Sequence, residues 1–136
     1  MQLGGLRLAG LILVVEDDEC TLKLLSDILK VIGYRVITAM NGVEAIESAS
    51  KDKPDLITMD IQLPLMNGVD AVRVLKSNPA TANIPIIAIT ASAMNGQEQT
   101  ALNAGCILQI SKPFDIDFLI TKIDDNFPRN KMVNHI

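Results

Sequence analysis

PDLITMD, at residues 54–60, is a short run of mostly aliphatic residues that ends in an acid. Three other runs have the same form, because each turns polar toward its C-terminal end: LILVVEDD at 11–18, IPIIAIT at 84–90 and CILQISKPF at 106–114. Buried parallel strands read as continuous apolar runs, and ligands of open α/β sheets bind at the carboxyl ends of the strands. The sequence therefore predicts that carboxylates, a hydroxyl and an ammonium meet in one crevice.

Helical patterns alternate with these strand-like runs. Another apolar run, YRVITA, predicts a strand at 34–39. Apolar residues at helical spacing and flanking glycines or acids predict helices over 21–33, 42–52, 69–77 and 115–127. A polar, alanine-rich stretch that Gly105 ends predicts another helix over about 95–104. Five β-then-α units in succession predict an α/β fold, with a five-stranded parallel sheet and helices on both faces.

Composition limits the function classes. A chain of 136 residues is expected to be one domain, at 11–127, with a leader at 1–10 and a C-terminal tail at 128–136. The net charge of −4 without a lysine or arginine cluster argues against a nucleic-acid partner. No apolar run approaches the ~20 residues that cross a membrane. Cys20 and Cys106 have no CxxC spacing, which favours reduced thiols and a cytoplasmic location.

Three carboxylates are candidates for a metal site. Glu16 and Asp17 directly follow the first apolar run, and adjacent acids repel each other unless a cation joins them. An N-cap role is the alternative for Asp17 or Asp18. Asp60 ends its strand, and an acid in that place is hard to explain by packing. Together the three acids favour an oxygen-preferring divalent ion, most simply Mg²⁺.

Thr90 and Lys112 end the last two runs. Alone, Thr90 is also an ordinary β-branched strand residue, and Lys112 also an ordinary solvated lysine. In the same crevice as the acids, a hydroxyl and an ammonium favour binding of a phosphoryl group. This interpretation requires the Asp60 side chain to face the crevice and not the interior.

The segments ILVVEDD, MDIQLPLMNG, ITASAM and SKPF resemble the receiver domain of two-component response regulators, from about residue 11 to 127. The resemblance implies a flavodoxin-like sheet with the order 2-1-3-4-5, which is the known order for that family. It also implies that Asp60 accepts a phosphoryl group from a histidine kinase or histidine phosphotransfer protein. Its other implications are Mg²⁺ held by Glu16, Asp17, Asp60 and the Gln62 backbone carbonyl, phosphoryl oxygens bound by Thr90 and Lys112, and a cis Lys112–Pro113 bond.

One position departs from that family. Its members usually carry Tyr or Phe three residues before the lysine, where this chain has Gln109. The switch is therefore expected to involve Thr90 and Gln109 without an aromatic ring. A stand-alone signalling module is expected to bind a downstream protein target through its fourth-helix to fifth-helix face.

Other functions remain as alternatives. A Mg²⁺-dependent phosphatase could use Asp60 as its nucleophile, although it needs a general acid where the chain has Gln62. A nucleotide- or flavin-binding domain lacks its GxGxxG or GxxxxGK[ST] signature here. The chain also fits the receiver module of a hybrid histidine kinase. The favoured hypothesis is that the protein is not an enzyme. Its only catalysis would be the phosphorylation and slow dephosphorylation of its own aspartate.

Overall fold

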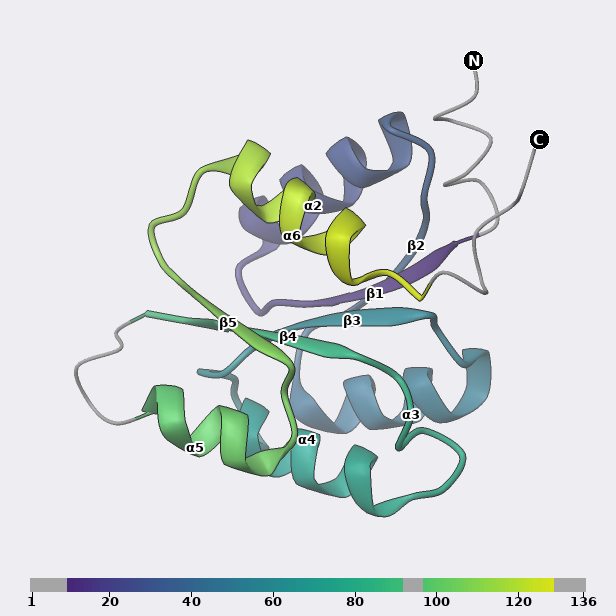
Figure 1. The fold of residues 1–136 in the computed structure, drawn as a ribbon, viewed down its shortest axis with the longest axis vertical. Coiled ribbons are helices and arrows are strands. Elements are labelled where there is room, and N and C mark those ends of the chain that lie inside the picture. Colours follow the sequence, from purple (N-terminus) through teal and green to yellow (C-terminus); the bar gives the residue numbers. More distant parts are fainter. Residues whose placement is uncertain (1–9, 92–96, 129–136) are drawn as a thin grey trace.

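The computed structural model describes residues 10–91 and 97–128 (Figure 1). Strands and helices alternate along them in this order: β1 (Leu11–Val15), α2 (Glu19–Val31), β2 (Arg35–Ala39), α3 (Gly42–Asp52), β3 (Leu56–Asp60), α4 (Gly68–Ser77), β4 (Ile86–Thr90), α5 (Gln97–Ala104), β5 (Leu108–Ser111) and α6 (Ile116–Asn126). The longest of these helices, α2, has 13 residues. Within these two ranges, no helix has the length and apolar character needed to cross a membrane.

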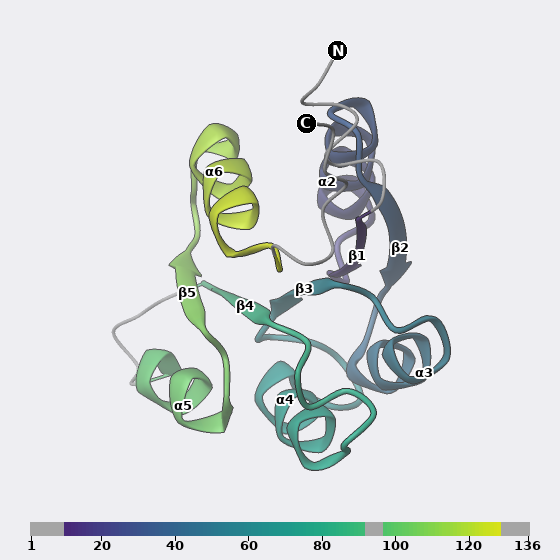
Figure 2. The same ribbon diagram turned by 45° about the vertical axis from the view of Figure 1, so that its right-hand side comes forward.

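The five strands form one parallel sheet in the order β2-β1-β3-β4-β5. Helices α2 and α6 cover one face, and α3, α4 and α5 cover the other, as Figures 1 and 2 show. The predicted fold class and strand order are confirmed. All the carboxyl ends of the strands therefore lie along the same edge of the sheet.

Three strands begin two residues later than the sequence predicted, and β2 begins one residue later than its predicted start at 34. The predicted starts at 54, 84 and 106 become Leu56, Ile86 and Leu108. Pro54 and Pro85 lie just before two of these starts, and proline has no N–H to donate to a neighbouring strand. The first helix begins at Glu19 and not at residue 21. The predicted start of the fourth helix, at 95, lies outside the described residues.

Two apolar layers hold the helices to the sheet. All residues of β3 and β4 are buried, as expected for central strands that are covered on both faces. Successive side chains of a strand point to opposite faces. Leu13, Val15 and Ala88 therefore pack in one layer with α3, α4 and α5. Ile12 and Val14 pack in the other layer with α2 and α6.

Three helices begin at the carboxyl edge of the sheet with a side-chain cap. The N-caps are Asp18, Asn41 and Asn67, and each accepts a hydrogen bond from the backbone N–H three residues on. Such a cap typically stabilises a helix by ~1 kcal/mol. These caps fix where the loops beside the crevice end and the helices begin.

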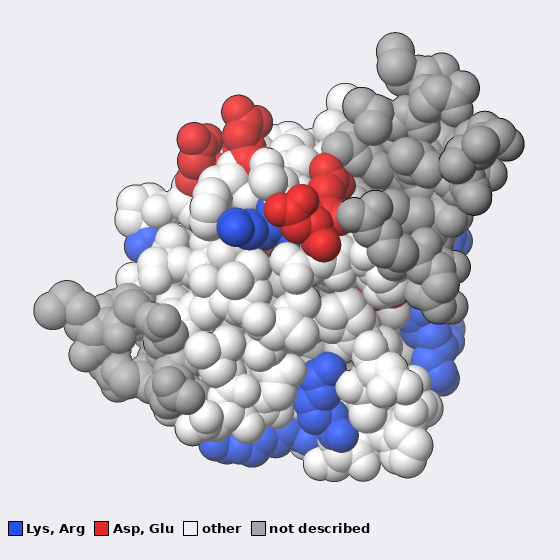
Figure 3. Space-filling view, in the orientation of Figure 1, with Lys and Arg blue, Asp and Glu red and all other residues white. Residues whose placement is uncertain are grey.

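Charge is unevenly spread on the face shown in Figure 3. Acidic side chains gather over α6, and lysine and arginine side chains lie along the opposite edge, near α4. The surface between them, over β5 and α5, is largely uncharged. Ile107, just before β5, and Phe118 on α6 are about half exposed, so apolar surface is accessible in this part of the molecule.

Candidate phosphoryl and metal site

Three carboxylates converge at the carboxyl edge of the sheet. Glu16 follows β1 and Asp60 ends β3, and these strands are parallel neighbours with Val15 opposite Met59. Asp17 follows Glu16 into the loop. One carboxylate oxygen from each of the three acids lies within 4.8 Å of the others. The strand register thus brings together acids that are more than 40 residues apart in the sequence.

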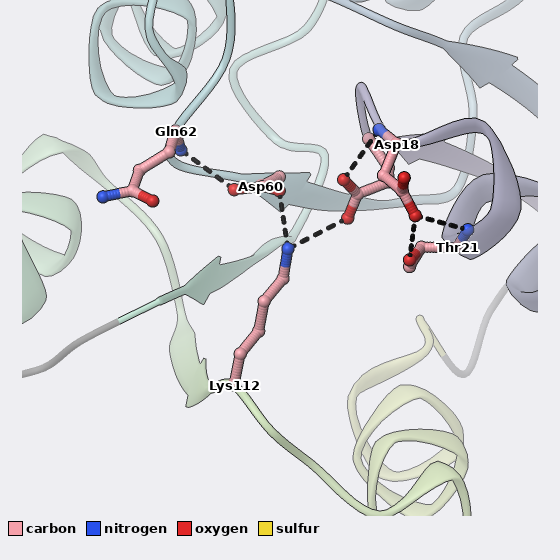
Figure 4. A network of polar contacts seen from close by, with 6 residues as sticks. Asp18, Thr21, Asp60, Gln62 and Lys112 are labelled. Atoms are coloured by element: carbon pink, nitrogen blue, oxygen red, sulfur yellow. Dashed lines mark hydrogen bonds and ion pairs between the residues drawn. The ribbon is translucent and has the colours of Figure 1, made fainter.

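Lys112 connects two of these acids, and Figure 4 shows its side chain reaching Asp60. Its ammonium lies 2.9 Å from Asp60 Oδ2 and 3.2 Å from Glu16 Oε1. The backbone N–H of Lys112 donates to the Thr90 carbonyl at 2.7 Å, just past the end of β5. This backbone bond fixes the base of the side chain, so that the ammonium extends over the acids. Charge-assisted contacts of this kind are stronger than those between neutral groups.

The pKa values of Glu16 and Lys112 are both raised in this cluster. Burial raises the pKa of Glu16; the hydrogen bond from the Asp18 backbone N–H opposes that rise, and the nearby Asp60 charge adds to it. For Lys112, burial lowers the pKa, but the hydrogen bond and charge of Asp60, together with Glu16, outweigh burial and raise it. The ammonium therefore stays protonated between the two acids.

Asp60 faces the crevice, although it is nearly covered there. Its side chain is 5% exposed. One oxygen, Oδ1, accepts a hydrogen bond from the Gln62 backbone N–H at 2.9 Å, and the other lies beside Lys112. Both oxygens thus have polar partners, and the carboxylate is not turned into the apolar core. A reaction at Asp60 requires access from the side of the acids and the ammonium.

Asp17 and Asp18 have different environments. Asp18 is the N-cap of α2, with its carboxylate accepting from the Thr21 backbone N–H at 2.9 Å and from the Thr21 hydroxyl. These two bonds lower the pKa of Asp18. Its own backbone N–H donates to Glu16 Oε2 at 3.1 Å. Asp17 is exposed and belongs to the acidic cluster. The capping alternative is therefore correct for Asp18 and wrong for Asp17.

The remaining candidates lie at or near the same edge. Thr90 ends β4 and is fully buried, with Ser111 beside it in register. Gln109 lies further back on β5, opposite Ala88. The peptide bond between Lys112 and Pro113 is cis. The structure thus brings Glu16, Asp17, Asp60, Thr90 and Lys112 to one edge, with Gln109 two residues behind it.

Gly68 lies against the site but was not among the predicted site residues. A Cβ at this position would lie 2.4 Å from the Asp60 carbonyl oxygen and 2.6 Å from the Ile61 Cα. The Gly68 N–H also donates to the Ile61 carbonyl at 2.8 Å. Only glycine allows α4 to begin so close to the end of β3. The available signal was its position directly after Asn67, at the start of the predicted helix.

A comparison with protein families identifies the family of the chain. The response regulator receiver domain matches residues 12–124, so the chain belongs to the receiver domain family of two-component response regulators. Its relatives include the polar-differentiation response regulator DivK of Brucella anthropi. The two are 41% identical over 112 residues, which cover 82% of this chain and 91% of that protein.

Solved receiver structures share the fold. The receiver domain of a sensor histidine kinase from Pseudomonas aeruginosa, with a magnesium ion coordinated in its active site cleft, superimposes with a TM-score of 0.80. It is 33% identical, and the match covers 85% of this chain and 95% of that one. The chemotaxis response regulator CheY4 of Vibrio cholerae has a TM-score of 0.80 at 27% identity, over 85% and 97% of the two chains.

Proposed function

We propose that the chain is a phosphorylation-controlled signalling module whose phosphoacceptor is Asp60. The observation that carries the proposal is the contact of Asp60 with Lys112, 2.9 Å away, beside two further acids at the edge of the sheet. Membership of the receiver family supports it. The phosphoryl donor would be a phosphohistidine on a histidine kinase or a histidine phosphotransfer protein.

The chemistry requires little beyond positioning and charge neutralisation. A carboxylate oxygen of Asp60 attacks phosphorus while the P–N bond of the phosphohistidine breaks, and the departing imidazole takes up a proton. The product is an acyl phosphate on Asp60. We assign Lys112 and the Thr90 hydroxyl to the phosphoryl oxygens, because Thr90 ends the neighbouring strand β4 and the Lys112 ammonium lies 2.9 Å from Asp60 Oδ2.

The acids also fit a magnesium ion. Their oxygens are hard ligands within 4.8 Å of one another, which is the donor set that Mg²⁺ prefers. We propose that Glu16, Asp17, Asp60 and the backbone carbonyl of Gln62 hold it. The solved Pseudomonas aeruginosa receiver with magnesium in its cleft supports this assignment. Bound there, the ion would supply positive charge to phosphoryl oxygens.

The output is proposed to be a change in protein binding. The surface over α5 and β5 is largely uncharged in Figure 3, and Ile107 just before β5 and Phe118 on α6 are about half exposed. Such surface suits a downstream protein target better than it suits nucleic acid or a membrane. Catalysis by the chain would be limited to its own aspartate, and we place the protein in the cytoplasm.

Acetyl phosphate with Mg²⁺ tests the assignment of Asp60. We expect intact mass spectrometry to show one added phosphoryl group on the wild-type chain and none on Asp60→Asn. Asp70→Asn is a matched control, because the Asp70 carboxylate is exposed on α4 and pairs with Arg73. Unchanged labelling of Asp60→Asn would falsify the assignment. Continuous turnover of phosphomonoesters would instead favour a phosphatase.

A further inference from the structure

The loop that follows β3 is closed on itself at the carboxyl edge of the sheet. The Gly68 N–H donates to the Ile61 carbonyl at 2.8 Å, so residues 62–67 leave the sheet and return to the place where they left it. Two side chains of this loop, Leu63 and Met66, are partly buried and pack against the apolar layer that holds α3, α4 and α5. The loop is thus fixed at its base and along its inner side.

The tip of the loop is a three-residue turn in a strained conformation. The Met66 N–H donates to the Pro64 carbonyl at 2.8 Å, which makes Leu65 the central residue of a γ-turn. The φ of Leu65 is 67°, in the left-handed region that residues with a side chain rarely adopt. A γ-turn with a positive φ at its centre is the rare and strained form. Glycine or asparagine would occupy this position at lower cost than leucine.

Packing does not explain a leucine at this position either. The Leu65 side chain is 85% exposed. Among the large apolar side chains of residues 10–91 and 97–128, only Val31 is as exposed, and it ends α2 at the opposite edge of the sheet. Strained backbone is typical of functional sites, because folding alone does not favour it. A residue that is strained and buries nothing in the free protein therefore indicates a role outside folding.

We propose that Leu65 is a docking residue for the protein that donates the phosphoryl group to Asp60. This inference rests on the proposed phosphorylation of Asp60. The Asp60 side chain is 5% exposed, so a phosphohistidine must reach it from the carboxyl edge of the sheet. A protein that carries the phosphohistidine then covers the loop tip, and Leu65 packs against an apolar surface of that donor. This contact buries a side chain that is otherwise in water. The donor is favoured over the downstream target, because only the donor must reach Asp60 itself.

The experiment compares wild-type chain with Leu65→Asn, because asparagine tolerates a positive φ and removes the apolar side chain. The protein donors are autophosphorylated histidine kinase domains that phosphorylate the wild-type chain in a phosphotransfer screen. Phosphoramidate is the second donor, which has a P–N bond but no protein surface. With the kinase domain, we expect the half-saturating concentration of Leu65→Asn to rise about tenfold, which corresponds to ~1.4 kcal/mol. The transfer rate at saturation and the labelling rate with phosphoramidate should stay within about twofold of wild type.

Two further variants test the chemistry of the contact. Leu65→Met keeps an apolar side chain and should have nearly the half-saturating concentration of wild type. Val31→Asn removes an equally exposed apolar side chain at the opposite edge of the sheet and should leave transfer from the kinase domain unchanged. Because Leu65→Asn relieves the strained turn, it should also melt roughly 2–4 °C above wild type.

Four results would overturn the docking role. One is an unchanged half-saturating concentration for Leu65→Asn. The second is phosphoramidate labelling that slows in parallel, since the substitution would then disturb Asp60 itself. The third is a melting temperature below that of wild type, which would refute the strained turn. The fourth is labelling of the wild-type chain by phosphoramidate but by no kinase domain. Failure of phosphoramidate to label the wild-type chain would instead refute the proposed function itself.

Discussion

The contact between Gly68 and the end of β3 leads to a quantitative prediction. In Gly68→Ala, the new Cβ would meet the Asp60 carbonyl oxygen at 2.4 Å, whereas Cβ atoms essentially never approach closer than 3.0 Å. Helix α4 and the end of β3 must therefore separate by at least 0.6 Å, the difference between these distances. Overpacking of this kind costs ~1–3 kcal/mol. The upper half of this range applies here, because the atoms that the new Cβ would meet, the Asp60 carbonyl oxygen and the Ile61 Cα, belong to the backbone.

Alanine is the better helix former, by at most ~1 kcal/mol in a helix interior, and Gly68 is only the first residue of α4. We therefore expect Gly68→Ala to lower the free energy of unfolding by about 2 kcal/mol, or the melting temperature by roughly 6 °C. Phosphorylation of Asp60 by acetyl phosphate should also slow several-fold, because the shift moves the backbone of Asp60.

Urea unfolding followed by circular dichroism measures the change. Val74→Ala is the control in the same helix, because Val74 is 43% exposed and its change should stay within about 0.5 kcal/mol. If Gly68→Ala unfolds at the same urea concentration and with the same slope as wild type, the backbone contact does not limit this position. The steric reasoning would then be wrong.

Two further predictions concern the ionisable groups. Burial raises the pKa of the Cys106 thiol to about 11, so Ellman's reagent at about pH 8 should modify exposed Cys20 alone until urea unfolds the chain; two reactive thiols in the native protein would contradict this. In Lys112→Met, Glu16 and Asp60 face each other without the ammonium between them. We expect the free energy of unfolding at about pH 7.5 to fall by about 2 kcal/mol. This is less than for a fully buried pair, because the Lys112 side chain is 33% exposed. The pKa of Glu16 is raised in the native state, so as the pH falls the native protein binds a proton at Glu16 before the unfolded chain does. The loss of unfolding free energy in Lys112→Met should therefore shrink as the pH falls toward about 5.5. A loss that is the same at both pH values would count against the assigned charges.

Much of the fold could be predicted from local pattern. Apolar runs with polar ends and helical spacing between them identified every strand and helix that the structure describes. The strand order came from the resemblance to receiver domains, since local pattern does not say which strands are neighbours. The predicted starts of β3 and β4 were wrong, because the sequence pattern that predicted these strands begins at Pro54 and just before Pro85. Proline has no N–H and cannot pair with a neighbouring strand on both sides.

The candidate site was predictable in part. The carboxyl ends of parallel strands share an edge, so Glu16, Asp60, Thr90 and Lys112 could be expected there together. The separate roles of neighbouring acids could not be predicted, because capping depends on the extended backbone at Asp18, with φ −83° and ψ 114°. The proximity of Gly68 to Asp60 depends on how α4 packs against β3.

The sequence by itself determined which segments form strands and helices and which polar residues end the strands, because these follow from periodicity and short-range preferences. Tertiary structure alone decided that the Lys112 ammonium reaches both acids, across separations of 52 and 96 residues. It also decided that the Asp60 side chain is nearly covered. Such contacts depend on register and packing between distant segments, which local sequence does not encode.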